Sequence, residues 1–184
     1  LDITEQFIGS DIALFAAHYI AKKPFKGQAV GWHQDGSYWP LEPMEVTTLW
    51  VAGTDSVVEN GCMQVIPGSH RPGIVEHGKS DREGNLLSIN QEIPDELVDK
   101  SDVVNIELGA GQASVHHGQL FHASHPNRSQ RRRAGLTVRF IPPQARQIEA
   151  NSIGSQWKPV LLRGSDNYHH YPDTSVPFAP PERN

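Results

Sequence analysis

The sequence predicts a mainly β protein, built as a sandwich or a barrel with few helices. Short apolar runs alternate with turn residues along most of the chain, which contains 16 glycines and 14 prolines among its 184 residues. The runs are rich in β-branched and aromatic residues, as expected for strands. Helical periodicity is scarce, so a sandwich or barrel is favoured over a helical bundle.

The elements follow in order. Residues 2–9 are expected to form a short helix that ends at Gly9, whereas residues 11–20 fit either a helix or a strand. The Lys-Pro pair at 23–24 favours extended backbone at the end of that run. The clearest strand candidates are short apolar runs bounded by turn residues, namely residues 47–52, 62–66, 103–108, 114–121 and 135–140.

One domain is expected over residues 1–184, because a chain of this length can bury a sizeable core. Residues 77–102 are charged and interrupt the strand pattern, so they are expected to form a surface insertion with a short helix near 94–100. Residues 143–184 are expected to be an irregular cover. The chain opens at Leu1 without a Met, and an N-terminal part is expected to be missing.

Composition narrows the class of function. A net charge of −5 and a pI near 6.0 argue against a nucleic-acid binder or a basic membrane-surface protein. No apolar run approaches the roughly 18 residues that span a bilayer. The single cysteine, Cys62, excludes an internal disulfide framework and a multi-cysteine zinc site, and it favours a reducing compartment, hence the cytoplasm. We therefore expect a small-molecule partner; no pattern indicates an oligomeric state.

The first candidate site lies in residues 31–40, GWHQDGSYWP. His33 and Asp35 are two residues apart, so on an extended strand both side chains emerge from the same face. They could converge on a metal ion, or they could be two polar groups of a surface strand. A third ligand downstream would decide between these alternatives.

Candidates for that ligand are His116, His117, His122 and His125. His122 ends an apolar run, and Arg133 follows it by eleven residues, just before the strand at 135–140. Two antiparallel strands joined by the turn-rich SHPNRSQ would place His122 and Arg133 on one face of a sheet. Two histidines and one carboxylate with open positions opposite form the pattern of non-haem Fe(II) oxygenases.

Three blocks, HQDGSYWP, NGCMQVIPGSHR and HASHPNRSQRRR, resemble the phytanoyl-CoA dioxygenase family of Fe(II)/2-oxoglutarate oxygenases. The resemblance runs from about Leu14 to Pro142. It implies a double-stranded β-helix, the cupin-like jelly roll, with a few flanking helices. Members of the family usually have a longer helical stretch before the first block, which again predicts a missing N-terminal part.

The resemblance also implies the roles of individual residues. His33, Asp35 and His122 would hold iron, and Arg133 would bind the distal carboxylate of 2-oxoglutarate. Ser124 and Trp50 match further cosubstrate positions. The implied cofactors are Fe(II), 2-oxoglutarate and O2, and the implied reaction is hydroxylation with release of succinate and CO2. Because nothing resembles a cradle for CoA, a small polar metabolite is the expected substrate.

Substrate contacts are less specific. Trp32, Tyr38 and Trp39 flank the His-x-Asp block and either pack the barrel mouth or wall the substrate pocket. Arg163 and His169 belong to a late cluster that either closes over the site or forms a surface tail.

Three other histidines are expected to support the structure. His116 and His117 point to opposite faces of their strand, so at most one can approach the metal, and both are expected in the core or just outside the ligands. His70 is expected to cap or pack.

Two alternatives to a hydroxylase remain open. A related halogenase would have a small residue in place of the carboxylate ligand, and Asp35 argues against it. A non-catalytic metal- or ligand-binding jelly roll leaves Arg133 and its spacing unexplained. The acidity of the chain disfavours a nucleic-acid patch at residues 131–133.

Overall fold

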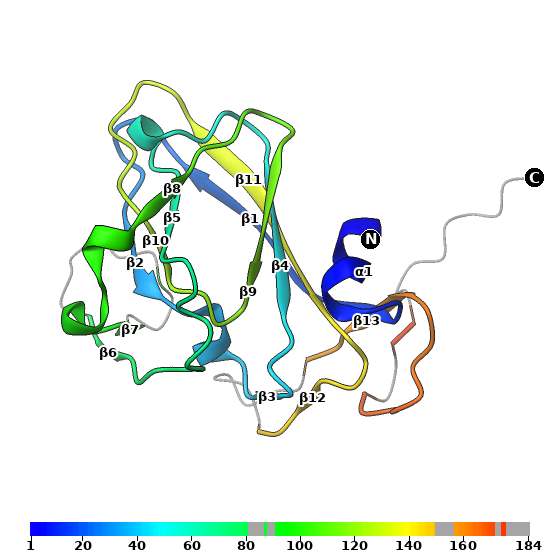
Figure 1. The fold of residues 1–184 in the computed structure, drawn as a ribbon. Helices are drawn as coiled ribbons and strands as arrows, with labels where there is room; N and C mark the ends of the chain where they lie inside the picture. The colour runs from blue at the N-terminus through cyan, green and yellow to red at the C-terminus, as the bar shows by residue number, and fades with distance from the viewer. Residues whose placement is uncertain (81–86, 88–90, 150–156, 172–173, 176–184) are drawn as a thin grey trace, which may run out of the picture.

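The computed structural model consists of two antiparallel sheets that face each other across a shared interior (Figure 1). It describes residues 1–80, 87, 91–149, 157–171 and 174–175. The large sheet has the order β13 (Val160–Arg163), β1 (Ile12–Lys22), β11 (Arg133–Ile141), β4 (Thr47–Ala52), β9 (Ala113–His117). The small sheet has the order β2 (Val30–His33), β10 (His122–Ser124), β5 (Met63–Val65), β8 (Val104–Ile106). The predicted jelly roll is confirmed.

Shorter elements complete the fold. The expected N-terminal helix is α1 (Asp2–Ile8), followed by Gly9. Two-stranded ladders pair β3 (Leu41–Glu42) with β12 (Arg146–Gln147), and β6 (Gly78–Lys79) with β7 (Gln91–Glu92). The 3-10 turns are η1 (Asp35–Tyr38), η2 (Val58–Asn60), η3 (Asp95–Leu97) and η4 (Lys100–Asp102).

The structure decides between the two alternatives for residues 11–20 and changes one other expected element. The run at 11–20, open between helix and strand, belongs to the long strand β1. It pairs with β11 over nearly its whole length. In place of the short helix expected near 94–100, the chain forms the turns η3 and η4.

The run at 114–121 is two elements rather than one strand. β9 ends at His117, and the chain leaves the large sheet at Gly118, whose N–H donates to the carbonyl of Val46. It then enters the small sheet as β10, beginning at His122. β10 and β11 consequently lie in different sheets. The hairpin expected between His122 and Arg133 is wrong, because the two residues belong to opposite walls of the interior.

The core is divided between two clusters. One contains Phe15, Trp39, Leu41, Val46, Ile141 and Tyr171. The other lies on the small sheet and contains Trp32, Ile66, Ile93, Val98 and Phe121.

Parts of the expected insertion and cover belong to these clusters. Within residues 77–102, Ile93 and Val98 are only 2% and 6% exposed. Within residues 143–184, Ala145 and Tyr171 are buried, and β13 pairs with the edge of the large sheet at β1.

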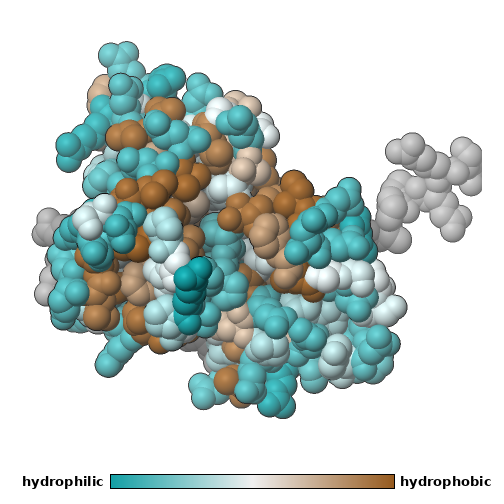
Figure 2. All heavy atoms as spheres, viewed as in Figure 1, coloured by the Kyte–Doolittle hydropathy of each residue, from teal (hydrophilic) through white to brown (hydrophobic). Residues whose placement is uncertain are grey.

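The face shown in Figure 2 is largely hydrophilic, with hydrophobic side chains reaching it in patches. Ile3 and Phe7 on α1 are among the exposed apolar residues. In the described part of the chain, every helix is too short or too polar to cross a membrane.

Candidate metal centre and a buried cation pair

Three candidate ligands meet where β2 and β10 pair. His33 ends β2, His122 begins β10 directly opposite it, and Asp35 opens η1. Asp35 Oδ1 lies 3.7 Å from His33 Nε2 and 3.8 Å from His122 Nε2. All three side chains are buried, and their ligand atoms lie within 4.8 Å of one another.

The residue between His33 and Asp35 holds this segment in place. Gln34 has extended backbone, so its neighbours project to one side and its own side chain to the other. Its Nε2 donates to the carbonyls of Gly73 and Gln119, and its Oε1 accepts from the N–H of Val75. These hydrogen bonds fix the backbone of the His-x-Asp segment on the side opposite to the two ligands.

Backbone carbonyls orient both imidazoles. His33 Nδ1 lies 2.9 Å from the carbonyl oxygen of Gly31, and His122 Nδ1 lies 2.9 Å from that of Leu120. A carbonyl oxygen can only accept, so each Nδ1 carries a hydrogen, and the neutral form of each ring presents a lone pair at Nε2. Burial lowers the pKa of His122 well below its usual value, so its ring stays neutral. Neutral imidazoles with free Nε2 atoms are the form that binds a metal.

Arg139 on β11 fixes the carboxylate. Its Nε donates to Asp35 Oδ2 at 3.1 Å, and its guanidinium lies 5.1 Å from the ring centre of Trp39. Burial alone would raise the pKa of Asp35, but Arg139 and the two histidines hold it well below the usual range. Since Oδ2 is engaged by Arg139, Oδ1 remains for a metal. His18 supports the arrangement with its Nδ1 2.8 Å from an Arg139 nitrogen.

The donor set fits a non-haem iron ion. It contains two imidazole nitrogens and one carboxylate oxygen, with no sulfur, which suits Fe(II) bound on one face. Bonds of about 2.1 Å at right angles would place neighbouring ligand atoms about 3 Å apart. The nitrogen–oxygen distances of 3.7 and 3.8 Å exceed this slightly. A small inward movement of the three side chains would complete the site.

A second charged site is built from Lys22 and Arg133, which face each other in the β1–β11 register. Both side chains are buried. Arg133 Nε donates to Ser56 Oγ at 3.3 Å, and its guanidinium lies 4.6 Å from the ring centre of Trp50. Burial lowers the pKa of Arg133 to about 10, so it is a cation at neutral pH. Among the described residues, no carboxylate forms an ion pair with either cation.

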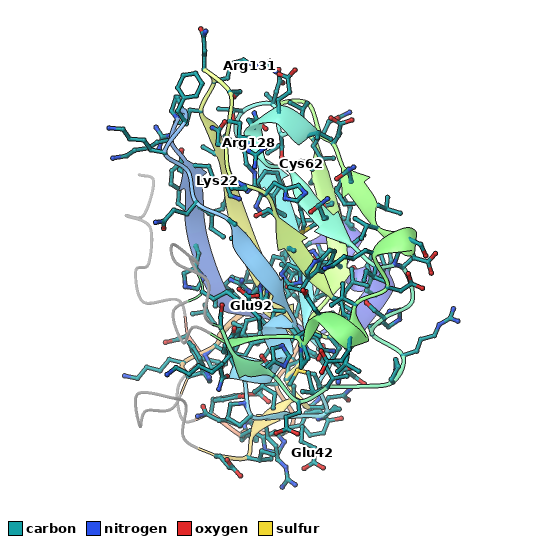
Figure 3. All side chains as sticks on the ribbon, turned by 90° about the vertical axis from the view of Figure 1, so that its left-hand side faces the viewer. Lys22, Glu42, Cys62, Glu92, Arg128 and Arg131 are labelled. Carbon is teal, nitrogen blue, oxygen red and sulfur yellow. The ribbon has the colours of Figure 1, made fainter. Side chains whose placement is uncertain are left out.

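Lys22 is fully buried and contacts β10. Its Nζ donates to Ser124 Oγ at 2.7 Å and to the carbonyls of Ser124 and His125. Burial, and then the charge of Arg133, lower the pKa of Lys22 to about 7. Lys22 lies toward the same end of the barrel as Cys62, and Glu42 is at the opposite end (Figure 3).

A glycine gives Trp50 its position beside Arg133. A Cβ on Gly135 would lie 2.5 Å from Trp50 Cζ2, closer than side-chain atoms can approach. The indole therefore lies flat against β11, two residues along from Arg133. Any larger residue at 135 would push Trp50 into the interior.

Several polar atoms of the large sheet face the same interior without a protein partner among the described residues. They are Thr48 Oγ1, Thr137 Oγ1, Ser114 Oγ and both ring nitrogens of His116. Burial lowers the pKa of His116 to about 4, so its ring is neutral, and it lies 5.0 Å from that of His122. Buried polar groups normally have partners, so these atoms are available to a polar ligand.

Most predicted site residues lie around this interior. Trp50, Ser124 and Arg133 gather at the cation pair, and the three candidate ligands meet at its other end. Trp39 contacts Arg139, and the ring of Tyr38 lies 6.4 Å from that of His33. As expected, only one of the paired histidines, His116, approaches the metal cluster.

Three predicted substrate residues are not brought to the cluster. Trp32 precedes His33 on β2, so alternation turns it to the other face, where it packs in the second core cluster. Arg163 forms ion pairs with Asp2 and Glu5 of α1. His169 is exposed in a turn, and its N–H donates to Asp166.

Lys22, Arg139 and His18 were not among the predicted site residues. A signal existed for each, because Arg139 is six residues beyond Arg133 and therefore on the same face of β11. Lys22 and His18 are four residues apart and likewise share a face of β1.

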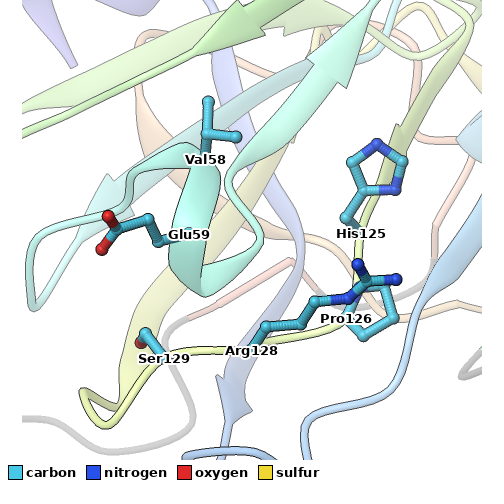
Figure 4. A pocket seen from close by; sticks show the side chains of 6 residues that line it. All are labelled: Val58, Glu59, His125, Pro126, Arg128 and Ser129. Atoms are coloured by element: carbon cyan, nitrogen blue, oxygen red, sulfur yellow. The ribbon is translucent and has the colours of Figure 1, made fainter.

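Two hollows lie outside the interior. One is lined by Val58 and Glu59 of η2 and by His125, Pro126, Arg128 and Ser129 of the loop after β10 (Figure 4). The other lies beside α1 and includes Phe7, Glu45, His70, His117 and Leu120. Neither contains a grouped set of candidate ligands among the described residues.

Known proteins resemble this chain in sequence. Residues 1–135 match the profile of the phytanoyl-CoA dioxygenase (PhyH) family. A phytanoyl-CoA dioxygenase of Arabidopsis thaliana is 37% identical over 123 residues, which are 67% of this chain and 42% of the relative. A probable alpha-ketoglutarate-dependent hypophosphite dioxygenase of Stutzerimonas stutzeri is 28% identical over 145 residues, covering 79% of this chain and 50% of the relative.

Solved structures share the fold. The apo form of ThoJ, described as a non-heme monooxygenase, superposes with a TM-score of 0.72 at 27% identity, covering 95% of this chain and 58% of ThoJ. Its nickel complex gives a TM-score of 0.71 at 26% identity, covering 99% of this chain and 61% of ThoJ. The chain spans about half the length of the curated relatives it matches. It belongs to the phytanoyl-CoA dioxygenase family, as its three sequence blocks predicted.

Proposed function

We propose that the protein is an Fe(II)- and 2-oxoglutarate-dependent dioxygenase that hydroxylates a small polar metabolite and releases succinate and CO2. The observation that carries this proposal is that one strand, β10, contributes to both charged sites. His122 belongs to the metal cluster, and Ser124 accepts from Lys22 at the cation pair.

The spacing of these two residues suits the cosubstrate. His122 and Ser124 lie on the same face of β10, and two residues of strand span about 7 Å. This is close to the length of a five-carbon dicarboxylate. One carboxylate and the keto oxygen would lie at the metal, and the far carboxylate would lie between Ser124 and Arg133.

Each residue has a defined role in this arrangement. His33, Asp35 and His122 hold iron, which with 2-oxoglutarate and O2 supplies the oxidising chemistry. Arg133 binds the distal carboxylate with two parallel donors, a geometry that lysine cannot reproduce. The Trp50 ring packs against the Arg133 guanidinium and helps to hold its orientation.

Further residues orient the ligands and exclude water. Arg139 occupies Asp35 Oδ2, so Asp35 would hold the metal through Oδ1 alone. The unpartnered atoms of Thr48, Ser114, His116 and Thr137 provide polar contacts along the cosubstrate. Trp39 and Tyr38, beside the metal cluster, are the best placed of the predicted substrate contacts.

The alternatives are less well supported. A halogenase needs the Asp35 position free for a halide, whereas Asp35 is ion-paired with Arg139 and directed at both histidines. A non-catalytic jelly roll gives no reason for burying two adjacent cations, which costs stability unless an anion binds.

Anaerobic reconstitution tests the proposal. Fe(II) and 2-oxoglutarate added together under nitrogen should produce a weak visible charge-transfer band that neither produces alone. A panel of small polar metabolites, scored by succinate release after admission of air, would then identify the substrate. A folded protein that binds neither iron nor 2-oxoglutarate would overturn the assignment.

A further inference from the structure

Lys22 occupies a site that the sequence blocks do not include, and the inference drawn from it rests on the proposed binding of 2-oxoglutarate. We propose that Lys22 is a positioning residue of the distal carboxylate site, where its ammonium orients the Ser124 hydroxyl toward the carboxylate and shares the anion's charge with Arg133. Binding of the dicarboxylate is then coupled to protonation of Lys22.

The burial of Lys22 is built into the fold. It is the last residue of β1, and its side chain has no exposed surface. A Cβ on Gly27 would lie 2.5 Å from Lys22 Cβ, so a glycine there lets the following loop close over the stem. Asn127 fastens that region, since its Nδ2 donates to the carbonyl of Lys22 and its N–H to the carbonyl of Gly27. A lysine enclosed in this way is not a solvated surface cation.

The contacts of Lys22 determine the direction of the Ser124 hydroxyl. Ser124 Oγ accepts from Nζ, so its own hydrogen must point away from the lysine. No described residue accepts that hydrogen. Because Ser124 shares a face with His122, the hydroxyl is available to an anion inside the barrel.

The charges around Lys22 lack a close counter-ion. The acceptors of Nζ are neutral oxygens of Ser124 and His125. The neighbouring charged group is Arg133, on the paired strand. Cys62 approaches from the start of β5, but burial raises the pKa of its thiol, so it stays neutral. Beyond Cys62, Glu107 is exposed and accepts from the N–H of Val58, and the His125 ring is also exposed.

Protonation of Lys22 should therefore depend on the ligand. With a pKa lowered to about 7, the lysine of the free protein is partly neutral at physiological pH. A carboxylate bound between Ser124 and Arg133 favours the charged form and raises this pKa. Above pH 7, Lys22 takes up a proton when the dicarboxylate binds. The affinity of the protein for the dicarboxylate then falls about tenfold per pH unit, until the pH reaches the pKa of Lys22 in the complex. The hollow beside His125 brings solvent close to this end of the barrel (Figure 4).

Titration of the anaerobic charge-transfer band with 2-oxoglutarate, at several pH values between about 6 and 9, measures this coupling. The wild-type dissociation constant should rise steeply above pH 7. In Lys22→Met, which keeps the length of the stem, binding should be weaker by about tenfold or more near pH 7. The steep rise with pH should also be absent. Lys23→Met removes the exposed neighbouring lysine and should behave as wild type.

Two further measurements do not depend on a single variant. NMR of the lysine side chains in the wild-type protein should show one ammonium that titrates near pH 7 and shifts upward when 2-oxoglutarate binds. Losses of affinity in Lys22→Met and Ser124→Ala should not add in the double variant, because the lysine acts through the serine.

The outcomes separate the two proposals. If 2-oxoglutarate binds with the same pH dependence in wild type and Lys22→Met, the role of Lys22 is overturned while the dioxygenase proposal stands. If 2-oxoglutarate fails to bind the wild-type protein at any pH, both fall.

Discussion

The two ends of the barrel interior differ in whether their buried charges have partners within the described protein. At the metal end, Asp35 lies beside two histidines and is ion-paired with Arg139, so its charge is balanced by that guanidinium. At the other end, Lys22 and Arg133 lie side by side without a carboxylate among the described residues. The charge at the metal end is neutralised without a ligand, whereas the positive charge at the other end is not.

This difference indicates how the site divides its tasks. A balanced metal end keeps its three ligands in position without iron, because Arg139, Gln34 and two backbone carbonyls hold them. An unbalanced cation end favours the ligand that carries the missing negative charge. The metal end therefore holds its ligands in position in advance, and the cation end provides most of the attraction for an anionic ligand.

The largest effect on iron binding and stability is expected when the Asp35 carboxylate is removed from the metal end. Asp35→Ala should abolish iron binding and also leave Arg139 buried without its anion, which costs about 3–5 kcal/mol in unfolding free energy. His122→Ala should abolish iron binding as well, but it keeps the ion pair and should cost less stability. Urea unfolding of the metal-free variants measures the difference. Equal losses would mean that Arg139 does not depend on Asp35.

At the unbalanced end, Arg133→Ala should weaken 2-oxoglutarate binding and spare iron. A hydrogen bond to a charged group contributes about 1.5–3 kcal/mol, which corresponds to roughly 10- to 150-fold in affinity. Arg133→Lys should recover only part of this loss. Arg131→Ala and Arg132→Ala, at exposed neighbours, are the controls. An unchanged dissociation constant in Arg133→Ala would place the distal carboxylate elsewhere.

The cation pair should also affect stability without any ligand. The pKa of Lys22 in the folded protein is about 7, below its usual 10.5, so the unfolded chain binds this proton more tightly. Lys22 therefore destabilises the fold most below about pH 7, and the penalty fades as the pH rises toward 10.5. The melting temperature of Lys22→Met minus that of wild type should be nearly constant below about pH 7 and fall between about pH 7 and pH 9. A difference that does not change with pH would show that Lys22 has an ordinary pKa.

The smallest effect is expected at Arg163, outside the interior. Its partners Asp2 and Glu5 are exposed, and exposed ion pairs contribute little to stability. Arg163→Ala should lower the melting temperature slightly and leave 2-oxoglutarate affinity unchanged. A higher dissociation constant for 2-oxoglutarate in this variant would show that Arg163 contributes to the binding site.

Local patterns in the sequence predicted much of this arrangement. Four of the five clearest strand candidates lie within two residues of their expected ends, because β-branched runs between glycine and proline define them. The three histidine and aspartate positions that meet at the metal cluster were also expected to do so. Alternation along β2 turns Trp32 away from His33, which favours the packing alternative for this residue.

Other features depend on long-range contacts. The crossing at Gly118 divides one apolar run between two sheets, and nothing local distinguishes a long strand from two short ones. The partnership of Arg139 with Asp35 joins residues 104 apart in sequence. Lys22 resembles its exposed neighbour Lys23 in sequence, and only the register of β1 against β11 shows which lysine is buried beside Arg133.

If 2-oxoglutarate binds as proposed, the adjacency of Lys22 and Arg133 also links the lifetime of the protein to this metabolite. A ligand that binds only the folded state stabilises that state by about 2.7 kcal/mol when its concentration is one hundred times its dissociation constant. A dicarboxylate that relieves the repulsion between the two cations would thus protect the chain from proteases in proportion to its supply. When 2-oxoglutarate is scarce, less of the protein would persist, and the metabolite that drives the reaction would also set the amount of catalyst.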